Sequence, residues 1–301
     1  MTPVSVRIVT VPAAPGAGPR ERLIADARGR LAEVHRRRFL AAHAADAQII
    51  TDPRAMRPAI ADPHTLTLEA GMLPLATAAD YDRIVEAAAA DRGPVHPAEP
   101  DRWRLAARID SPLDLLLAAR DWRLPEPLRA DALALGARPE LAALRGALAD
   151  ITRALVDRRA QVLVVGRERP AEPPWDPVRV RALVRWEPDP RLAMDLARPD
   201  LLVHALAPQA DAAIVDTRVL LAARLARGGR QWPSLEDCLA SDLLEPEAVA
   251  DPWLRDLTAA AAMGGLPVLL GGPSLLAWGV RLLLTGRRRN PVRPDTARAG
   301  Q

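Results

Sequence analysis

Three aspartates directly follow strand-like runs, where a carboxylate could help to hold a divalent cation. In open α/β sheets the ligand-binding residues lie at the carboxyl ends of the strands. Magnesium is usually held there by one or two carboxylates together with substrate phosphates. These strand-end carboxylates are therefore candidate ligands for a divalent cation. The candidate metal ligands are Asp52, Asp110 and Asp216.

Two glycine-containing loops each lead into a predicted helix and could bind an anion. Free backbone amides at the start of a helix attract a phosphate or carboxylate group. The candidate binding residues are Gly16, Gly18, Arg20, Gly271, Gly272 and Ser274. For the first loop an ordinary connection is the alternative, because Pro15 and Pro19 each remove an amide. Its glycines also do not form the dinucleotide-binding fingerprint.

Residues 111–114, Ser-Pro-Leu-Asp, have the pattern of a helix N-terminus. The serine suits the N-cap, the proline suits the first helical position, and Asp114 can bond back to the cap. Asp114 therefore has a structural explanation that competes with a catalytic one. Asp110 belongs to neither the cap nor the apolar pattern of the predicted strand 105–109, so it is the better candidate for chemistry.

The 301-residue chain contains no lysine, so all 41 of its Lys/Arg residues are arginines. This excludes a phosphate-loop lysine, a Schiff-base lysine and a lysine general base, and leaves phosphate contacts to arginine or backbone amides. Against 38 acidic residues the net charge is only +3. Because nucleic-acid binding needs a concentrated basic face, we expect no nucleic-acid partner.

The sequence shows no signal peptide, and we expect a cytoplasmic protein without a membrane segment. Residues 259–280 are uncharged throughout, but glycines and prolines divide the run into a helix end, a strand and a second helix start. The single cysteine, Cys238, excludes an intrachain disulfide. We interpret it as a small buried residue rather than a nucleophile.

Strands and helices alternate along the chain, which predicts α/β architecture with mostly parallel sheets. We predict a three-layer domain over residues 1–123, a linker over 124–139, a second, smaller, doubly wound α/β domain over 140–289, and a loose tail over 290–301. The linker is placed by three prolines and a glycine.

The first 120 residues resemble the nucleotidyltransferases of the molybdenum-cofactor and 2-phospholactate guanylyltransferase type. The similarity lies in the order of strand, glycine-containing loop, helix and strand, followed by LPLATAADYDRIVEAA and ARIDSPLDLL. The resemblance implies that Gly16, Gly18 and Arg20 contact nucleotide phosphates. It also implies a Mg²⁺ cofactor, with Asp110 as the catalytic residue that lies near this metal. It also implies a nucleoside triphosphate and a small phosphorylated or cofactor-like acceptor as substrates.

Two departures from that family leave a second hypothesis open. The loop lysine is absent, and Gly71-Met72 stand where the family has an aspartate. A domain without that carboxylate loses a metal ligand. The alternative is therefore a catalytically inactive binding or scaffold protein whose C-terminal domain contacts a protein partner.

Overall fold

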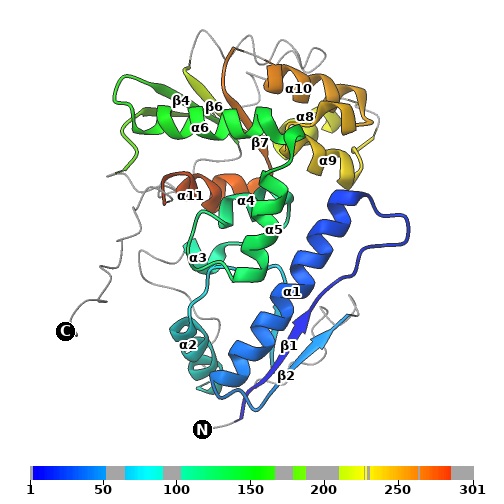
Figure 1. The fold of residues 1–301 in the computed structure, drawn as a ribbon, viewed down its shortest axis with the longest axis vertical. Coiled ribbons are helices and arrows are strands. Elements are labelled where there is room, and N and C mark those ends of the chain that lie inside the picture. The colour runs from blue at the N-terminus through cyan, green and yellow to red at the C-terminus, as the bar shows by residue number, and fades with distance from the viewer. Residues whose placement is uncertain are drawn as a thin grey trace, which may run out of the picture.

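The computed structural model is an α/β protein built on two parallel sheets (Figure 1). It describes residues 3–51, 65–90, 103–166, 179–187, 210–226, 228, 231–263 and 265–285. The candidate ligand Asp52 and the predicted tail lie outside these ranges. None of the helices described there is long and apolar enough to span a membrane.

The N-terminal sheet has the strand order β2-β1-β3. Its strands are β1 (Ser5–Val9), β2 (Asp46–Ile50) and β3 (Thr65–Glu69). All pairs are parallel, with Val6 of β1 opposite Ala47 and Leu66. Helix α1 (Pro19–Ala41) connects β1 to β2 and begins with the proline that suits a first helical position. The order of strand, glycine-containing loop, helix and strand that the sequence indicates is confirmed.

A group of helices follows this sheet. They are α2 (Ala78–Ala89), α3 (Trp103–Ala106), α4 (Pro112–Ala118) and α5 (Glu126–Gly136). The predicted capping box of α4 is confirmed, because Ser111 and Asp114 bond to each other's backbone amides. The prediction of a strand over 105–109 was wrong. Leu105 and Ala106 end α3, since leucine and alanine favour helix, and Arg108 makes a single antiparallel bridge to Met72.

Helix α5 occupies most of residues 124–139, the segment predicted as a linker. Pro125 lies at its N-cap and Pro127 in its first turn, so two of the prolines that suggested a linker open a helix instead. Leu128, Ala132 and Leu135 are buried, and α5 packs against α1 and α4.

The C-terminal sheet has the strand order β5-β4-β6-β7, again all parallel. Its strands are β4 (Gln161–Val165), β5 (Leu183–Glu187), β6 (Ala212–Asp216) and β7 (Val268–Gly271). With four described strands it is wider than the N-terminal sheet, so the second unit is not the smaller one by this measure. Helix α6 (Ala142–Val156) crosses one face of β4, β6 and β7 (Figure 1).

The remaining helices surround the C-terminal sheet. They are α8 (Thr217–Ala226), α9 (Leu235–Asp242), α10 (Pro252–Met263), the π-helix η6 (Leu275–Gly279) and α11 (Val280–Thr285), with short 3₁₀ turns η2 (Pro139–Leu141) and η5 (Pro246–Ala248). The uncharged run 259–280 is thus divided among α10, β7 and η6, as predicted.

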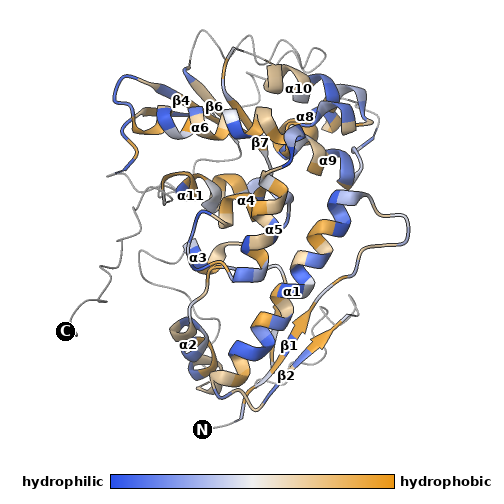
Figure 2. Ribbon diagram, viewed as in Figure 1, coloured by the Kyte–Doolittle hydropathy of each residue, from blue (hydrophilic) through white to orange (hydrophobic). Residues whose placement is uncertain are grey.

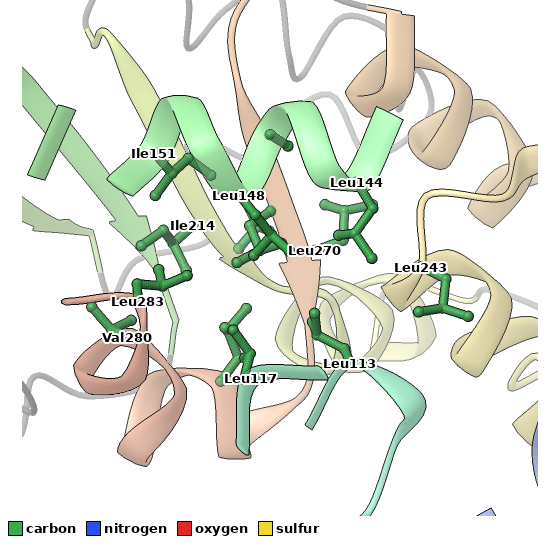
Figure 3. Packing of buried hydrophobic residues seen from close by; sticks show 14 of the residues in the cluster. Leu113, Leu117, Leu144, Leu148, Ile151, Ile214, Leu243, Leu270, Val280 and Leu283 are labelled. Carbon is green, nitrogen blue, oxygen red and sulfur yellow. The ribbon is translucent and has the colours of Figure 1, made fainter. Parts of the chain in front are cut away.

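One hydrophobic core extends through both units. Hydrophobic residues dominate α4 and β7, which lie where the units meet (Figure 2). Leu113 and Leu117 of α4 enter the same cluster as Leu148 of α6 and Leu270 of β7 (Figure 3). A smaller core, which contains Phe39 and Tyr81, covers the N-terminal sheet.

Candidate functional site

The carboxyl ends of both sheets reach the start of α4. Directly after β3, Gly71 accepts a hydrogen bond from the amide of Ile109 at 2.8 Å. After β7, the hydroxyl of Ser274 donates to Asp114 at 2.8 Å. Ligands of open α/β sheets bind outside the carboxyl ends of the strands. The start of α4 therefore lies where both sheets present ligand-binding positions.

Several predicted site residues gather in this region. Asp216 ends β6, pairs in register with Gly271, and lies beside the point where the strand order reverses between β4 and β6. Gly271 is the last residue of β7 and Gly272 follows it, while the Ser274 hydroxyl donates to Asp114 of α4, whose own carboxylate accepts from the Asp110 amide. Residues far apart in the sequence are thus brought to one edge by the parallel topology.

Asp110 faces two arginines. Its Oδ1 lies 2.6 Å from a guanidinium nitrogen of Arg28, and its Oδ2 lies 3.2 Å from Nε of Arg108. Arg28 also donates to the carbonyl oxygen of Ile109 at 2.9 Å. The side chain of Asp110 is 39% exposed, but both carboxylate oxygens are engaged by guanidinium groups. A cation would have to displace them.

The described residues do not fit a magnesium site. They contain no group of three His, Cys, Asp or Glu side chains that could hold a metal ion. Asp110 is paired with arginines, and Asp216 is buried and accepts a hydrogen bond from the amide of Arg218 at 2.9 Å. No chemical step is therefore assigned to a metal ion.

A buried ion pair joins α8 to α9 beside this edge. Arg218 binds Asp242 through its two terminal guanidinium nitrogens, and the distance from Nη2 to Oδ2 is 2.7 Å. The Asp242 side chain is 0% exposed. Asp242 and the neighbouring Ser241 are both buried, and Ser241 accepts a hydrogen bond from Thr258. Cys238 is buried too, as predicted, and burial raises the pKa of its thiol.

The start of α1 is occupied by an internal carboxylate. Glu236 of α9 accepts hydrogen bonds from the amides of Arg20 at 3.2 Å and Glu21 at 3.1 Å. The Arg20 side chain lies between Glu236 at 2.8 Å and Glu245 at 2.6 Å. A glutamate of the C-terminal unit thus fills the position that the sequence suggested for a phosphate.

Gly18 makes room for this contact. A Cβ atom at Gly18 would lie 2.2 Å from Cδ of Glu236, although the Gly18 backbone itself is compatible with alanine. Gly16 is different, because its φ of 82° favours glycine. Nothing lies within 4 Å of a Cβ at Gly16, so that glycine is explained by backbone conformation rather than by close approach.

We expect Gly18→Ala to lower the free energy of unfolding by about 1–2 kcal/mol, because the new methyl group displaces Glu236 from the helix start. Urea denaturation of the single and double variants with Glu236→Ala measures this. The double variant should lose little more than either single variant, since both remove the same contact. Fully additive losses would contradict this explanation.

A cavity of about 670 Å³ opens at the carboxyl ends of β1 and β2, next to α1. Its lining combines hydroxyl, carboxylate and guanidinium groups with small apolar side chains. The lining residues are Thr10, Pro12, Ala13, Ala25, Asp26, Gly29, Arg30, Glu33 and Thr51. The sequence reasoning missed this cavity; the signal was the spacing of positions 26, 29, 30 and 33 on one face of the helix.

The charged groups of the cavity differ in their availability. Arg30 pairs with Asp131 of α5 at 2.6 Å. Glu33 accepts from Arg36 at 2.7 Å, and that hydrogen bond holds the pKa of Glu33 below its usual value. Asp26 makes no ion pair within the described ranges, so its carboxylate is an available acceptor for donors of a ligand.

The fold and these contacts define an α/β protein in which two parallel sheets meet at the start of one helix. The chain matches no protein-family model, no curated protein and no solved structure.

Proposed function

We propose that this chain binds a nucleoside triphosphate, with the nucleoside in the cavity between α1 and the ends of β1 and β2. The observation that carries the proposal is the cavity itself, whose volume of about 670 Å³ is typical of small-molecule sites. It lies at the carboxyl edge of a parallel sheet, where α/β proteins bind their ligands. The resemblance to nucleotidyltransferases supports a nucleotide as the ligand.

The lining offers suitable partners for both parts of a nucleotide. Thr10, Thr51 and the Asp26 carboxylate can accept hydrogen bonds from ribose hydroxyls or base amino groups. Arg30 bonds Asp131 through Nη1 and can donate to phosphate through its other guanidinium nitrogens, and amides of the β1–α1 loop can donate as well. Because Glu236 already occupies the start of α1, the phosphates would lie on the cavity side of the loop.

Transfer of the nucleotidyl group to a small phosphorylated or cofactor-like acceptor is the catalytic version of this proposal. The pairing of Asp110 with Arg28 and Arg108 favours the non-catalytic version, in which the chain binds the nucleotide without transferring it. In that version the C-terminal unit contacts a protein partner.

Calorimetric titration with each of the four ribonucleoside triphosphates, with and without MgCl₂, tests the proposal. We expect one of them to bind. In Gly29→Leu the affinity should fall about tenfold or more, since a Cβ at Gly29 meets nothing within 4 Å and Gly29 lines the cavity. Binding that persists unchanged in Gly29→Leu, or no binding of any triphosphate, would rule out this site.

Gly146→Leu is the matched control. Gly146 lies within α6, away from the cavity, and a Cβ there also meets nothing within 4 Å. Both variants replace a helical glycine, so each should raise the free energy of unfolding by about 0.5–1 kcal/mol. A loss of binding in Gly29→Leu alone therefore reports on the cavity and not on stability. Magnesium-dependent binding that disappears in Asp110→Asn would instead support the catalytic version.

A further inference from the structure

Helix α1 presents two opposite charges to the cavity, one helical turn apart. Asp26 and Arg30 both line the cavity, and their spacing of four residues places them on the same face of the helix. Side chains at this spacing have Cβ atoms about 5–6 Å apart. A ligand that contacts both side chains must therefore carry an acceptor for Arg30 and a donor for Asp26 within a short distance of each other.

The two side chains require different ligand groups. A guanidinium can only donate hydrogen bonds and suits phosphate, whereas an ionised carboxylate can only accept. Asp26 is exposed, and no side chain in the described part of the chain forms an ion pair or hydrogen bond with its carboxylate. Because a free carboxylate repels phosphate, the part of the ligand beside Asp26 must be uncharged and rich in hydrogen-bond donors.

The wall formed by the strand ends carries no charge. Thr10 and Thr51 follow β1 and β2, and the amide of Thr10 already donates to the carbonyl oxygen of Ile50 at 2.9 Å. The two threonines offer hydroxyl groups, which can both donate and accept. Among the cavity residues, Asp26 is therefore the strong acceptor without a partner in the described structure.

The order of groups in a nucleotide decides which of them lies beside Asp26. The ribose is bonded directly to the α-phosphate, and the base lies beyond the ribose. With the phosphates near Arg30 and the β1–α1 loop, the donors one helical turn away are ribose hydroxyls rather than base amino groups. Two neighbouring hydroxyls can each donate to one oxygen of a carboxylate.

We infer that Asp26 binds the 2′- and 3′-hydroxyls of ribose and makes the cavity select ribonucleotides over 2′-deoxyribonucleotides. This inference rests on the proposed function for its ligand and adds the residue that selects the sugar. The selection comes from charge-assisted hydrogen bonds, which are stronger than those between neutral groups.

Calorimetric titration of the full chain with ATP, GTP, CTP and UTP, and with dATP, dGTP, dCTP and dUTP, tests the inference. We expect the 2′-deoxy form of the bound triphosphate to bind about tenfold or more weakly, because it lacks one donor to Asp26. Equal affinity for the two forms would overturn the inference and leave the proposed function standing.

Asp26→Ala completes a cycle of protein and ligand changes. The variant should lose about tenfold or more in affinity for the ribonucleotide, but nothing for its 2′-deoxy form beyond the remaining 3′-hydroxyl contact. A preference for ribose that persists in full in Asp26→Ala would show that another group selects the sugar and would overturn the inference.

Asp82→Ala is the matched control. Asp82 is an exposed carboxylate of α2 outside the cavity lining, so its removal changes the net charge equally. It should leave the preference for ribose unchanged, and the same loss of preference as in Asp26→Ala would overturn the inference.

Ribose 5-phosphate and 2-deoxyribose 5-phosphate separate failure of this inference from failure of the proposed function. They carry the phosphate and the sugar without the base. If no triphosphate binds, the proposed function fails. A preference for ribose 5-phosphate that disappears in Asp26→Ala would still support the role of Asp26, with a sugar phosphate as the ligand. Absence of binding in both sets of probes would overturn both proposals.

Discussion

Replacing Asp242 with alanine is expected to lower the free energy of unfolding by about 3–5 kcal/mol, because it leaves the Arg218 guanidinium buried without its partner. Asp242 is 0% exposed and binds two nitrogens of Arg218, whose side chain is only 18% exposed, so water replaces the lost carboxylate poorly. Urea denaturation at pH 7 gives the value.

The control is the double variant Arg218→Met/Asp242→Leu. It removes both charges and fills the space with apolar side chains, so its stability should return close to that of the unsubstituted protein. If the double variant were as unstable as Asp242→Ala, the loss would come from packing and not from an unpaired charge.

Acidification from pH 7 to pH 4 should lower the free energy of unfolding by about 3 kcal/mol through His35 alone, an upper estimate from its pKa shift. Burial, with a smaller effect of the Arg38 charge, lowers the pKa of His35 from 6.5 to about 4, against the backbone hydrogen bonds to Met72 and Ala70. Below pH 6.5, His35 binds a proton in the unfolded chain but stays neutral in the folded chain until the pH approaches 4. The stabilisation is therefore full above pH 6.5 and is lost as the pH falls towards 4.

Urea titrations at half-unit pH intervals measure this effect in the unsubstituted protein and in His35→Gln. The glutamine can still donate towards Met72, as the ring Nε2 does at 2.9 Å, but it does not titrate. Tyr81→Phe is the control, because it removes the 2.6 Å bond to Nδ1 but leaves the ring buried and titratable. If the free energy of unfolding of His35→Gln still fell by the same amount between pH 7 and pH 4, another group would be responsible.

His35 and Asp114 act in opposite directions over nearly the same pH range. Burial raises the pKa of Asp114 from 3.8 to about 7, so the folded chain holds a proton there that the unfolded chain releases. Between about pH 4 and pH 6.5, rising pH restores the stability contributed by neutral His35 and weakens the contribution of protonated Asp114. The profile of the unsubstituted protein therefore contains both effects, and the two single variants, His35→Gln and Asp114→Asn, separate them.

The local patterns in the sequence predicted local structure well. The capping box at Ser111 begins α4, and the glycines and prolines of the uncharged run 259–280 divide it among α10, β7 and η6. Each of these signals is contained within a few residues. The strand predicted at 105–109 was wrong because strand formation needs a partner: the segment forms one bridge and then a connection to α4.

The candidate site depended on contacts between distant parts of the chain. The pairing of Asp110 with Arg28, and of Arg20 with Glu236, joins residues that no local spacing connects. The same holds for the hydrogen bond between Asp114 and Ser274, which changes a helix cap into a contact between sheets. These polar residues could be identified as candidates from the sequence. Which of them pair with one another depends on the tertiary fold.

The shared hydrophobic core has a consequence for biosynthesis. Leu113 and Leu117 of α4 are covered by residues of β7 and α11, including Leu270 and Leu283, which leave the ribosome much later. A nascent chain that already contains the whole N-terminal sheet therefore still exposes the apolar face of α4. The core of the first unit is therefore completed only when the second unit has been made, and until then these leucines are exposed to chaperones and to aggregation.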